Sequence, residues 1–422
     1  MSTSLRPYQL RALDEAAEAY HRGSRAILLV APTGAGKTRI GVEFCRRKQT
    51  LWLAHRTELV EQSVAHLRRE GVEDVGVITA RESNPNRVTV ASIQTLLARE
   101  STPTAEVVVF DEAHHFVADK WKQIADAYIG AIRIGLTATP ERADGSALGD
   151  IFTELVKVSS VPELTDAGHL VPLEIYAGSC VDGAIAQHPR EVFNRGRATI
   201  VFAANVAHAE SLQQDLGGAV VLGTTAAEDR ARIVAEFKAG RVNPLINLYC
   251  LTEGFDAPNA EVCILARGCD SLPLYLQIVG RILRPAPGKH SARLYDLSGA
   301  VHKHGLPTGD REYSLTGKPI SKTLGEVWQC KACGAVLEAY PGPTCSECGA
   351  TAQPGPPRTP KITREELRLI RETHDNERRI EALRKLAATA KIKGYKPGWA
   401  AYRFKSRYGR WPTREEQQSV RV

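Results

Sequence analysis

Short apolar runs alternate with longer amphipathic stretches over the first 300 residues of the chain. The runs lie at 26–30, 51–54, 88–91, 107–110 and 133–136, and then at 199–202, 220–222, 245–248, 262–265 and 293–296. Runs of this length are typical of buried strands, and their alternation with helices predicts parallel sheets with helices on both faces. We therefore expect an α/β fold with two doubly wound parallel-sheet lobes in tandem.

Composition divides the chain further. A length of 422 residues corresponds to roughly three domains, and a hydrophobic content of 43% is enough for globular cores. We expect lobe 1 at 1–160, lobe 2 at 161–305 with a crossover linker at 161–194, a polar connector at 300–325, a cysteine-bearing segment at 326–350, a proline-rich linker at 351–360 and a helical module at 361–422.

A glycine-rich segment, Ala-Pro-Thr-Gly-Ala-Gly-Lys-Thr at 31–38, follows the first expected strand and opens a helix. A turn in this context directs backbone amides at phosphate oxygens, and the helix N-terminus adds its dipole. It departs from the strict pattern, which begins with glycine, at Ala31. Lys37 is expected to reach the β- and γ-phosphates, and the Thr38 hydroxyl to bind Mg²⁺. The expected ATP-binding residues here are Thr33, Gly34, Ala35, Gly36, Lys37 and Thr38.

A pair of carboxylates ends the apolar run at 107–110. Asp111 at a strand end can hold Mg²⁺ together with Thr38. Glu112 is then placed to orient and deprotonate a water molecule. The two segments together predict hydrolysis of a nucleoside triphosphate, with Lys37, Asp111 and Glu112 as catalytic residues.

With these motifs in family order, the chain resembles the superfamily two helicases of the DEAD/DEAH class over roughly residues 5–300. The resemblance implies two RecA-like lobes and a nucleic-acid-dependent ATP hydrolase. It implies adenine contacts by Arg6 and Gln9, nucleic-acid contacts by His55, Arg56, Gln94 and Thr95, and coupling of hydrolysis to strand movement by His114, Thr137 and Thr139.

In lobe 2 the resemblance implies sensing of nucleotide and nucleic acid by Thr252, Gly254 and Asp256, and catalytic roles for Gln277, Arg281 and Arg284. The segment Gly-Arg-Ile-Leu-Arg-Pro at 280–285, followed by Pro-Gly-Lys at 287–289, is most similar to DNA translocases of the XPB and UvsW type. Compact members of that type occur in phages and prophages, which makes such an origin an expectation here. Leu222 stands where the resemblance implies a histidine.

The distance between Lys37 and the two arginines along the chain is itself informative. Arg281 and Arg284 are permanently charged and belong to the other lobe. An arginine that stabilises charge on the γ-phosphoryl group is worth roughly 10³–10⁵ in rate. If both lobes must meet around ATP, hydrolysis opens and closes a cleft, and a cleft that grips nucleic acid in one state is a stepping device.

Four of the nine cysteines form a repeated pattern. Cys330 and Cys333 are separated by two residues, as are Cys345 and Cys348, and a glycine follows each pair. Four thiolates at this spacing can enclose Zn²⁺ tetrahedrally, so the sequence predicts a small structural zinc ribbon at 326–350. Two disulfides are the alternative, which a reducing cytosol disfavours.

The net charge of +7 conceals an asymmetry. Residues 351–422 contain 18 lysine and arginine residues against 8 aspartate and glutamate residues, a charge of +10, whereas the remainder carries −3. A basic segment is the electrostatic signature of a phosphate-backbone partner. We expect a short final helix with nucleic-acid contacts by Arg403, Arg407 and Arg410. Phe404 and Tyr408 are expected in the core of this module, and the roles of Trp399 and Trp411 stay open.

The sequence favours an ATP-dependent DNA helicase or translocase that acts on branched or duplex DNA in replication or recombination. An RNA helicase, a scaffold with an inactive ATPase, and the motor subunit of a restriction or defence complex are alternatives. The expected cofactors are ATP, Mg²⁺ and structural Zn²⁺. The N-terminus is polar, and no apolar run approaches the roughly 18 residues of a membrane span, so we expect a cytoplasmic location and no membrane partner.

Overall fold

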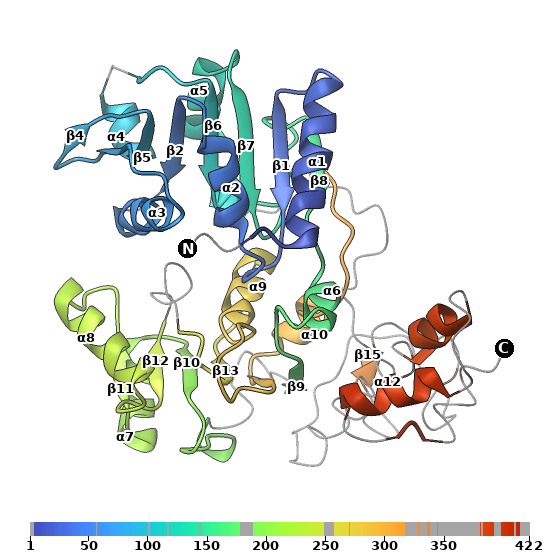
Figure 1. The fold of residues 1–422 in the computed structure, drawn as a ribbon. Helices are drawn as coiled ribbons and strands as arrows, with labels where there is room; N and C mark the ends of the chain where they lie inside the picture. Colours follow the sequence, from blue (N-terminus) through green and yellow to red (C-terminus); the bar gives the residue numbers. More distant parts are fainter. Residues whose placement is uncertain are drawn as a thin grey trace.

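The computed structural model describes most of the first 316 residues and several short stretches of the remainder (Figure 1). The described ranges are 4–55, 57–99, 102–115, 118–142, 146–177, 189–248, 257–269, 271–316, 328–329, 336–337, 344, 380, 383–391, 398–408 and 411–413.

Lobe 1 is built on an eight-stranded sheet in the order β4-β3-β5-β2-β6-β7-β1-β8, in which every recorded pairing is parallel except that of β3 with β4. Its strands are β1 (Ala26–Val30), β2 (Thr50–Ala54), β3 (Val75–Ile78), β4 (Ser83–Asn84), β5 (Val88–Ser92), β6 (Val107–Asp111), β7 (Ile132–Thr137) and β8 (Glu154–Lys157). The five strands expected here are confirmed within one residue at each end. Three further strands, β3, β4 and β8, lack a long apolar run.

Helices cover both faces of this sheet because successive side chains of a strand point to opposite sides. In β1, Ile27 and Leu29 belong to one apolar cluster, which also contains residues of α1 (Pro7–His21), α2 (Lys37–Cys45) and α3 (Thr57–Arg69). Leu28 and Val30 belong to a second cluster with residues of α4 (Ile93–Ala98) and α5 (Ala118–Ala127). The 3-10 turn η1 (Ala113–His115) follows β6.

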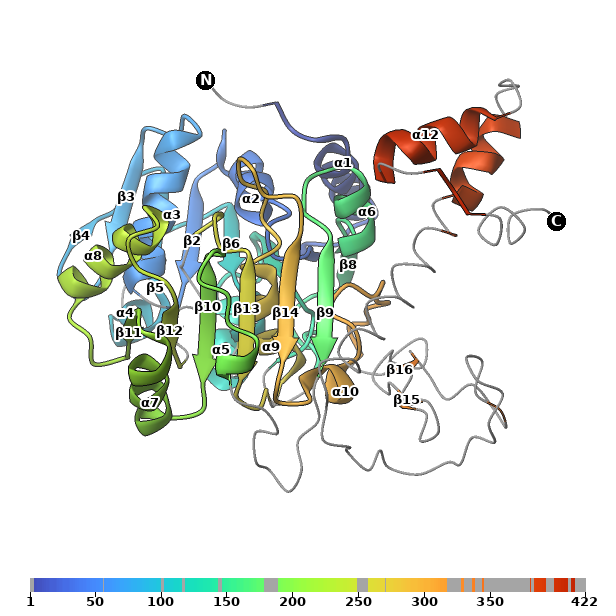
Figure 2. The same ribbon diagram turned by 90° about the horizontal axis from the view of Figure 1, so that it is seen from below.

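Lobe 2 contains a six-stranded, all-parallel sheet in the order β11-β12-β10-β13-β14-β9, seen in the foreground of Figure 2. Its strands are β9 (Leu173–Ala177), β10 (Thr199–Ala203), β11 (Ala219–Val221), β12 (Leu245–Asn247), β13 (Val262–Ala266) and β14 (Ala292–Asp296). Its other elements are η2 (Pro189–Glu191), α7 (Val206–Leu216), α8 (Ala227–Lys238), α9 (Leu272–Gly280) and α10 (Ala300–His304). The prediction of two α/β lobes with parallel sheets is confirmed.

Two connecting segments differ from the expectation. The crossover linker at 161–194 contains helix α6 (Val161–Asp166) and contributes β9, which pairs with β14 at the edge of the lobe 2 sheet. The expected polar connector forms α10 and then returns to lobe 1, where Tyr313 and Leu315 pack against its apolar cluster. Asp310 also forms a 2.6 Å ion pair with Lys157 at the end of β8. In β9, Leu173 and Ile175 alternate with Glu174 and Tyr176, a strand pattern that the expectation of a linker overlooked.

The C-terminal part is described only in fragments. Strands β15 (Trp328–Gln329) and β16 (Val336–Leu337) form an antiparallel pair on either side of the first expected zinc-binding cysteine pair. Residues 383–391 are helical, and α12 (Trp399–Tyr408) matches the expected final helix. Phe404 is fully buried, as expected for a core residue. Among the residues that the structure describes, no helix has the length and apolar character needed to cross a membrane.

Candidate functional site

The glycine-rich segment joins β1 to α2 in the conformation that a phosphate-binding loop requires. Gly34 and Gly36 have φ angles of +92° and +79°, a left-handed region in which an L side chain is strained. Gly36 is the N-cap of α2, so the first amides of the helix face the loop. The two glycines therefore allow the backbone path of the loop, and the loop and the N-terminus of α2 together form an anion-binding site.

Lys37 and two acidic residues lie beside this loop. Lys37 is 9% exposed, and its Nζ donates to the carbonyl oxygen of Ala31 at 3.4 Å and lies 4.0 Å from Glu112 Oε1. Desolvation and the neighbouring Glu112 carboxylate raise the pKa of Asp111 to about 7, against the opposing effect of the Lys37 ammonium group. The site therefore concentrates negative charge and would be stabilised by a cation.

This charge balance and the donor set fit the expected Mg²⁺. The carboxylate of Asp111 and the hydroxyl of Thr38 are hard oxygen donors, and Mg²⁺ is usually held by one or two carboxylates together with substrate phosphates. The raised pKa of Asp111 shows that its carboxyl group lacks sufficient compensation for the loss of water and for the charge of Glu112. A divalent cation held by Asp111 and Thr38 would supply that compensation.

Glu112 has an unusual backbone conformation. Its φ angle is +49°, and it is the only non-glycine residue with positive φ among the residues that the structure describes. Its own amide donates to Asp111 Oδ1 at 3.1 Å. A left-handed non-glycine residue costs on the order of 1–3 kcal/mol and persists where the surroundings enforce it, which is common at functional sites.

The first helix contacts the phosphate loop from the side. Tyr8 Oη donates to the carbonyl oxygen of Ala35 at 2.9 Å, and Gln9 Nε2 donates to the same oxygen at 3.1 Å. The Gln9 Oε1 accepts from the backbone amide of Arg6 at 3.0 Å, and Arg6 Nη1 donates to Tyr8 Oη at 3.0 Å. The expected adenine-reading residues are thus tied to the loop, and Tyr8 joins them.

A chain of hydrogen bonds links the acidic segment to lobe 2. Gln277 Nε2 lies 2.7 Å from His114 Nε2, and His114 Nδ1 lies 3.1 Å from Thr137 Oγ1, which donates to the carbonyl oxygen of Thr139 at 2.6 Å. Because the amide nitrogen of Gln277 is a donor, His114 accepts at Nε2 and carries its proton on Nδ1. All four residues are buried. The expected coupling residues His114, Thr137 and Thr139 are therefore in direct contact with one another and, through His114, with the other lobe.

Lobe 2 also touches the phosphate loop itself. A Cβ atom placed on Gly280, the last residue of α9, would lie 2.4 Å from the Cβ atom of Thr33. A Cβ atom on Gly34 would lie 3.6 Å from Cγ of Arg284 and 2.9 Å from Cδ2 of Leu170. The structure therefore places Arg284 over the loop, although it is some 245 residues away in the sequence.

The expected nucleic-acid contacts of lobe 1 lie at neighbouring strand ends. His55 follows β2 and Gln94 follows β5, and these strands are paired in parallel with Ala54 opposite Ser92. Gln94 is exposed, and its Oε1 accepts from Ser92 Oγ at 3.1 Å, whereas Thr95 is half-buried on α4. These positions share the edge of the sheet that carries Asp111.

Several expected residues lie outside the described parts of the chain. They are Arg56, Thr252, Gly254, Asp256, Arg410 and the four expected zinc ligands Cys330, Cys333, Cys345 and Cys348, and the side chain of Arg407 is likewise not described. Zn²⁺ binding therefore stays a prediction. Arg281 is described and is 8% exposed at the end of α9.

Sequence reasoning assigned no role to three residues that the structure places at or beside the site. Tyr8 lies between the two expected adenine contacts, Arg6 and Gln9, and its hydroxyl group was the signal that it could hydrogen-bond. Gly280 lies in the segment 280–285 discussed above, but its close approach to Thr33 is visible only in the structure. Lys289 is 8% exposed and hydrogen-bonds the carbonyl oxygen of Arg284 at 2.8 Å, which no local pattern reveals.

Two family comparisons match the two lobes separately. Residues 2–142 match the family described as "Type III restriction enzyme, res subunit", and residues 185–286 match "Helicase conserved C-terminal domain". The chain therefore belongs to the superfamily two helicases, and it is a nucleic-acid-dependent ATPase of that class.

Two curated relatives show which proteins of this class the chain is similar to. A 51.5 kDa protein of a Lactococcus phage is 26% identical over 364 residues, which cover 76% of this chain and 77% of the phage protein. The DNA 3'-5' helicase XPB of Kineococcus radiotolerans is 27% identical over 342 residues, which cover 69% of this chain and 59% of that protein. The chain thus spans about three quarters of the phage protein but less than two thirds of this XPB relative.

Solved structures agree on the fold. The Saccharomyces cerevisiae protein Dbp5, bound to RNA and ADP with BeF3, has a TM-score of 0.52 at 17% identity. The matched region covers 74% of this chain and 93% of the Dbp5 chain. The type ISP restriction-modification enzyme LlaBIII, bound to DNA, has a TM-score of 0.54 at 15% identity and covers 70% of this chain and 28% of its own. These likenesses confirm the fold and do not discriminate between DNA and RNA.

Proposed function

We propose that this protein is an ATP-driven DNA translocase or helicase that works on duplex or branched DNA in replication or recombination. The observation that carries the proposal is the meeting of both lobes at the phosphate loop. Gly280 and Arg284 of lobe 2 lie against Thr33 and Gly34 of lobe 1, and Gln277 contacts His114. A site to which both lobes contribute couples the hydrolysis of bound ATP to closure of the lobes.

The chemistry follows from the residues in place. Lys37 and the amides at the start of α2 bind the β- and γ-phosphates. Thr38 and Asp111 would hold Mg²⁺, which would neutralise charge on the phosphates. Glu112 orients the attacking water and accepts its proton. Arg281 and Arg284 stabilise the charge that develops on the transferring phosphoryl group.

Loss of the γ-phosphate would remove the charge that Arg284 is proposed to neutralise at the loop, and the contact between Gln277 and His114 lies in the same interface. The hydrogen-bond chain from Gln277 through His114 to Thr137 and Thr139 connects that interface to the end of β7. The nucleic-acid contacts proposed for His55, Gln94 and Thr95 lie on the same sheet edge. Closure of the lobes on ATP, and their release after hydrolysis, would therefore change how tightly this edge holds the nucleic acid.

DNA is the proposed substrate because of the relatives. The XPB relative is named a DNA helicase, and the phage protein matches over most of both chains. An RNA helicase is the alternative that the fold permits, since Dbp5 was solved with RNA. A phage or prophage origin and a role in phage DNA metabolism would fit the match to the Lactococcus phage protein.

We also propose an auxiliary DNA contact at α12. Tyr402 and Trp411 are 66% and 52% exposed, and Lys405 Nζ lies 4.7 Å from the centre of the Trp411 ring. Arg403 is exposed and lies over Trp399, with Cζ 5.9 Å from its ring centre. No acidic residue occurs between 399 and 413, so cations and exposed rings together suit a phosphate backbone and an unstacked base.

Steady-state ATP hydrolysis tests the main proposal. It is measured without nucleic acid and with single-stranded, duplex and forked DNA and with RNA, at one fixed salt concentration because phosphate contacts weaken with salt. Stimulation by duplex or forked DNA with little by RNA supports a DNA motor. Stimulation by RNA alone refutes the DNA assignment, and no stimulation by any of them refutes an autonomous motor.

A second candidate function is favoured by one observation. Lobe 1 matches the family of restriction res subunits over residues 2–142. Residues 351–422 carry no Asp…Glu-x-Lys nuclease pattern, so for a restriction or defence complex we propose that a separate subunit cuts the DNA. Co-purification of the tagged chain with a nuclease or methyltransferase subunit, followed by ATP-dependent DNA cleavage, would distinguish this function from independent translocation.

A further inference from the structure

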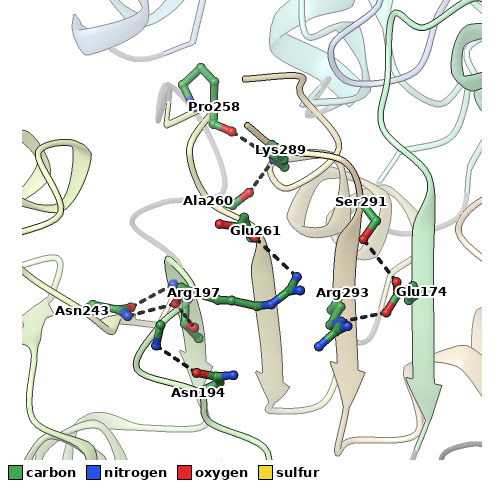
Figure 3. A network of polar contacts seen from close by, with 12 residues as sticks. Glu174, Asn194, Arg197, Asn243, Pro258, Ala260, Glu261, Lys289, Ser291 and Arg293 are labelled. Atoms are coloured by element: carbon green, nitrogen blue, oxygen red, sulfur yellow. Dashed lines mark hydrogen bonds and ion pairs between the residues drawn. The ribbon is translucent and has the colours of Figure 1, made fainter. Parts of the chain in front are cut away.

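Lys289 is a buried lysine whose ammonium group is surrounded by backbone carbonyl oxygens. Its Nζ donates to the carbonyl oxygens of Pro258 at 2.9 Å, Ala260 at 2.5 Å and Arg284 at 2.8 Å. Figure 3 shows the first two of these contacts from close by. An ammonium group has three N–H donors, so all of its hydrogen-bonding capacity is used on the main chain.

The three carbonyl groups come from two segments that are distant in the sequence. Pro258 and Ala260 belong to the loop that precedes β13 and continues the segment 251–256, which was expected to sense nucleotide and nucleic acid. Arg284 follows α9 and lies over the phosphate loop. Lys289 therefore holds these two segments at a fixed distance from one another.

Packing alone does not account for a lysine at this position. Burial lowers the pKa of Lys289 to about 8, Arg284 lowers it as well, and Glu261 raises it. A buried ammonium group is costly unless its donors are satisfied. A methionine of similar length could fill the space but would leave the three carbonyl oxygens without this donor. What the ammonium group contributes, and methionine does not, is a fixed position for three carbonyl oxygens.

We propose that Lys289 is a positioning residue that aligns Arg284 for ATP hydrolysis by binding its carbonyl oxygen together with the loop 257–260. The inference rests on the proposed role of Arg284 in ATP turnover. The three hydrogen bonds of the Lys289 ammonium group all go to backbone carbonyl oxygens, so the proposed role acts through the backbone that carries the arginine. Its loss should therefore reduce turnover more than ATP affinity.

The test uses Lys289→Met, which keeps the length and removes the charge, in the full-length protein with saturating DNA. Arg293→Met is the matched control, because Arg293 is also a lobe 2 cation and forms a 2.7 Å ion pair with Glu174 between β14 and β9 (Figure 3). Lys37→Ala and Arg284→Ala are measured in parallel. The readouts are kcat, KM for ATP and the melting temperature.

We expect Lys289→Met to lower kcat by at least about tenfold with KM for ATP within about threefold, since misplacement of a catalytic group acts on the transition state. Arg293→Met should lower the melting temperature by at least as much and leave kcat nearly unchanged. Wild-type kcat should fall above about pH 8, where the Lys289 ammonium group loses its proton, and Lys289→Arg should lack this fall.

A kcat of Lys289→Met within about twofold of wild type, or an equal loss in Arg293→Met, would overturn the inference. Should Lys289→Met not fold, the pH profiles of wild type and Lys289→Arg decide, and identical profiles would overturn it. Retained turnover in Lys37→Ala or Arg284→Ala would instead show that the proposed function is wrong, so the two failures are distinguishable.

Discussion

Replacement of Gly280 by alanine tests directly whether the two lobes must touch for ATP hydrolysis. The backbone of Gly280 is not in the left-handed region, so alanine introduces no backbone strain. Its new methyl group would lie 2.4 Å from Cβ of Thr33 and 2.9 Å from Cγ2 of the same residue. Carbon atoms in contact sit at about 3.5–4.0 Å, so the lobes must separate locally by more than about 1 Å.

We expect the substitution to leave the melting temperature unchanged or slightly higher but to lower the rate of ATP hydrolysis. Gly280 ends α9, where alanine is up to about 1 kcal/mol better than glycine, so the melting temperature should be unchanged or slightly higher. A displacement of about 1 Å between catalytic groups can cost on the order of 10²-fold in rate, or about 2.7 kcal/mol of activation free energy. We therefore expect DNA-stimulated kcat to fall by about 10- to 100-fold.

The assay compares kcat, nucleotide affinity and melting temperature of Gly280→Ala with those of wild type and of Gly130→Ala. Gly130 is the matched control, since a Cβ atom there meets nothing within 4 Å and its φ angle is ordinary. Nucleotide affinity should change little, because the loop and α2 belong to lobe 1. Wild-type kcat in Gly280→Ala, or a comparable loss in Gly130→Ala, would refute the reasoning that close approach of the lobes drives hydrolysis.

Four other predictions concern single groups and the tail. Lys37→Ala should abolish ATP turnover with no loss of fold, and retained turnover would mean that the phosphate-binding loop is misassigned. Glu112→Gln should keep ATP binding and block hydrolysis, so an equal loss of both, measured by nucleotide binding and by phosphate release, would contradict its action on water. Deletion of 351–422 should flatten the salt dependence of DNA binding while basal ATPase persists, and an unchanged slope in a salt titration would exclude the basic tail as a phosphate contact. Because the pKa of Lys289 is lowered from 10.5 to about 8, the folded protein binds fewer protons than the unfolded chain between these values. Its contribution to the free energy of unfolding should therefore rise with pH across that window by up to about 3 kcal/mol, and chemical denaturation of Lys289→Met should lack this increment.

Much of the fold was predictable because its central strands are buried on both faces. The strands β1, β2, β10 and β13 are continuous runs of buried residues, and β6 is buried up to its last residue, Asp111. The sequence shows them as apolar runs. β8 and β9 lie at sheet edges, and β9 falls between prolines within the segment expected to be a linker. β9 does carry the local alternation of Leu173 and Ile175 with Glu174 and Tyr176, but its place at the edge of the lobe 2 sheet depends on pairing with β14, which is distant in the sequence.

The candidate site divides in the same way. The left-handed glycines of the phosphate loop and the carboxylates after β6 follow from local chemistry at a strand end, and the structure places them as expected. The contact of Gly280 with Thr33 and the three carbonyl partners of Lys289 are long-range contacts between elements. Sequence reasoning identified the motifs around these residues but could not supply the partner of either.

The connections between the lobes constrain how they can move. The crossover carries Leu170 to the phosphate loop and bonds the amide of Val171 to the carbonyl oxygen of Leu283 at 2.9 Å. The segment after α10 returns to lobe 1, where Tyr313 and Leu315 pack on its apolar cluster and the carbonyl oxygen of Leu315 approaches Gly149. Apolar burial of this kind holds more strongly than the exposed ion pair between Lys157 and Asp310. Because the chain crosses between the lobes twice, release of the contacts at Thr33 and His114 favours rotation about these crossings over complete separation. Under the proposed function, such a rotation would convert loss of the γ-phosphate into a directed change at the sheet edge where nucleic acid is proposed to bind.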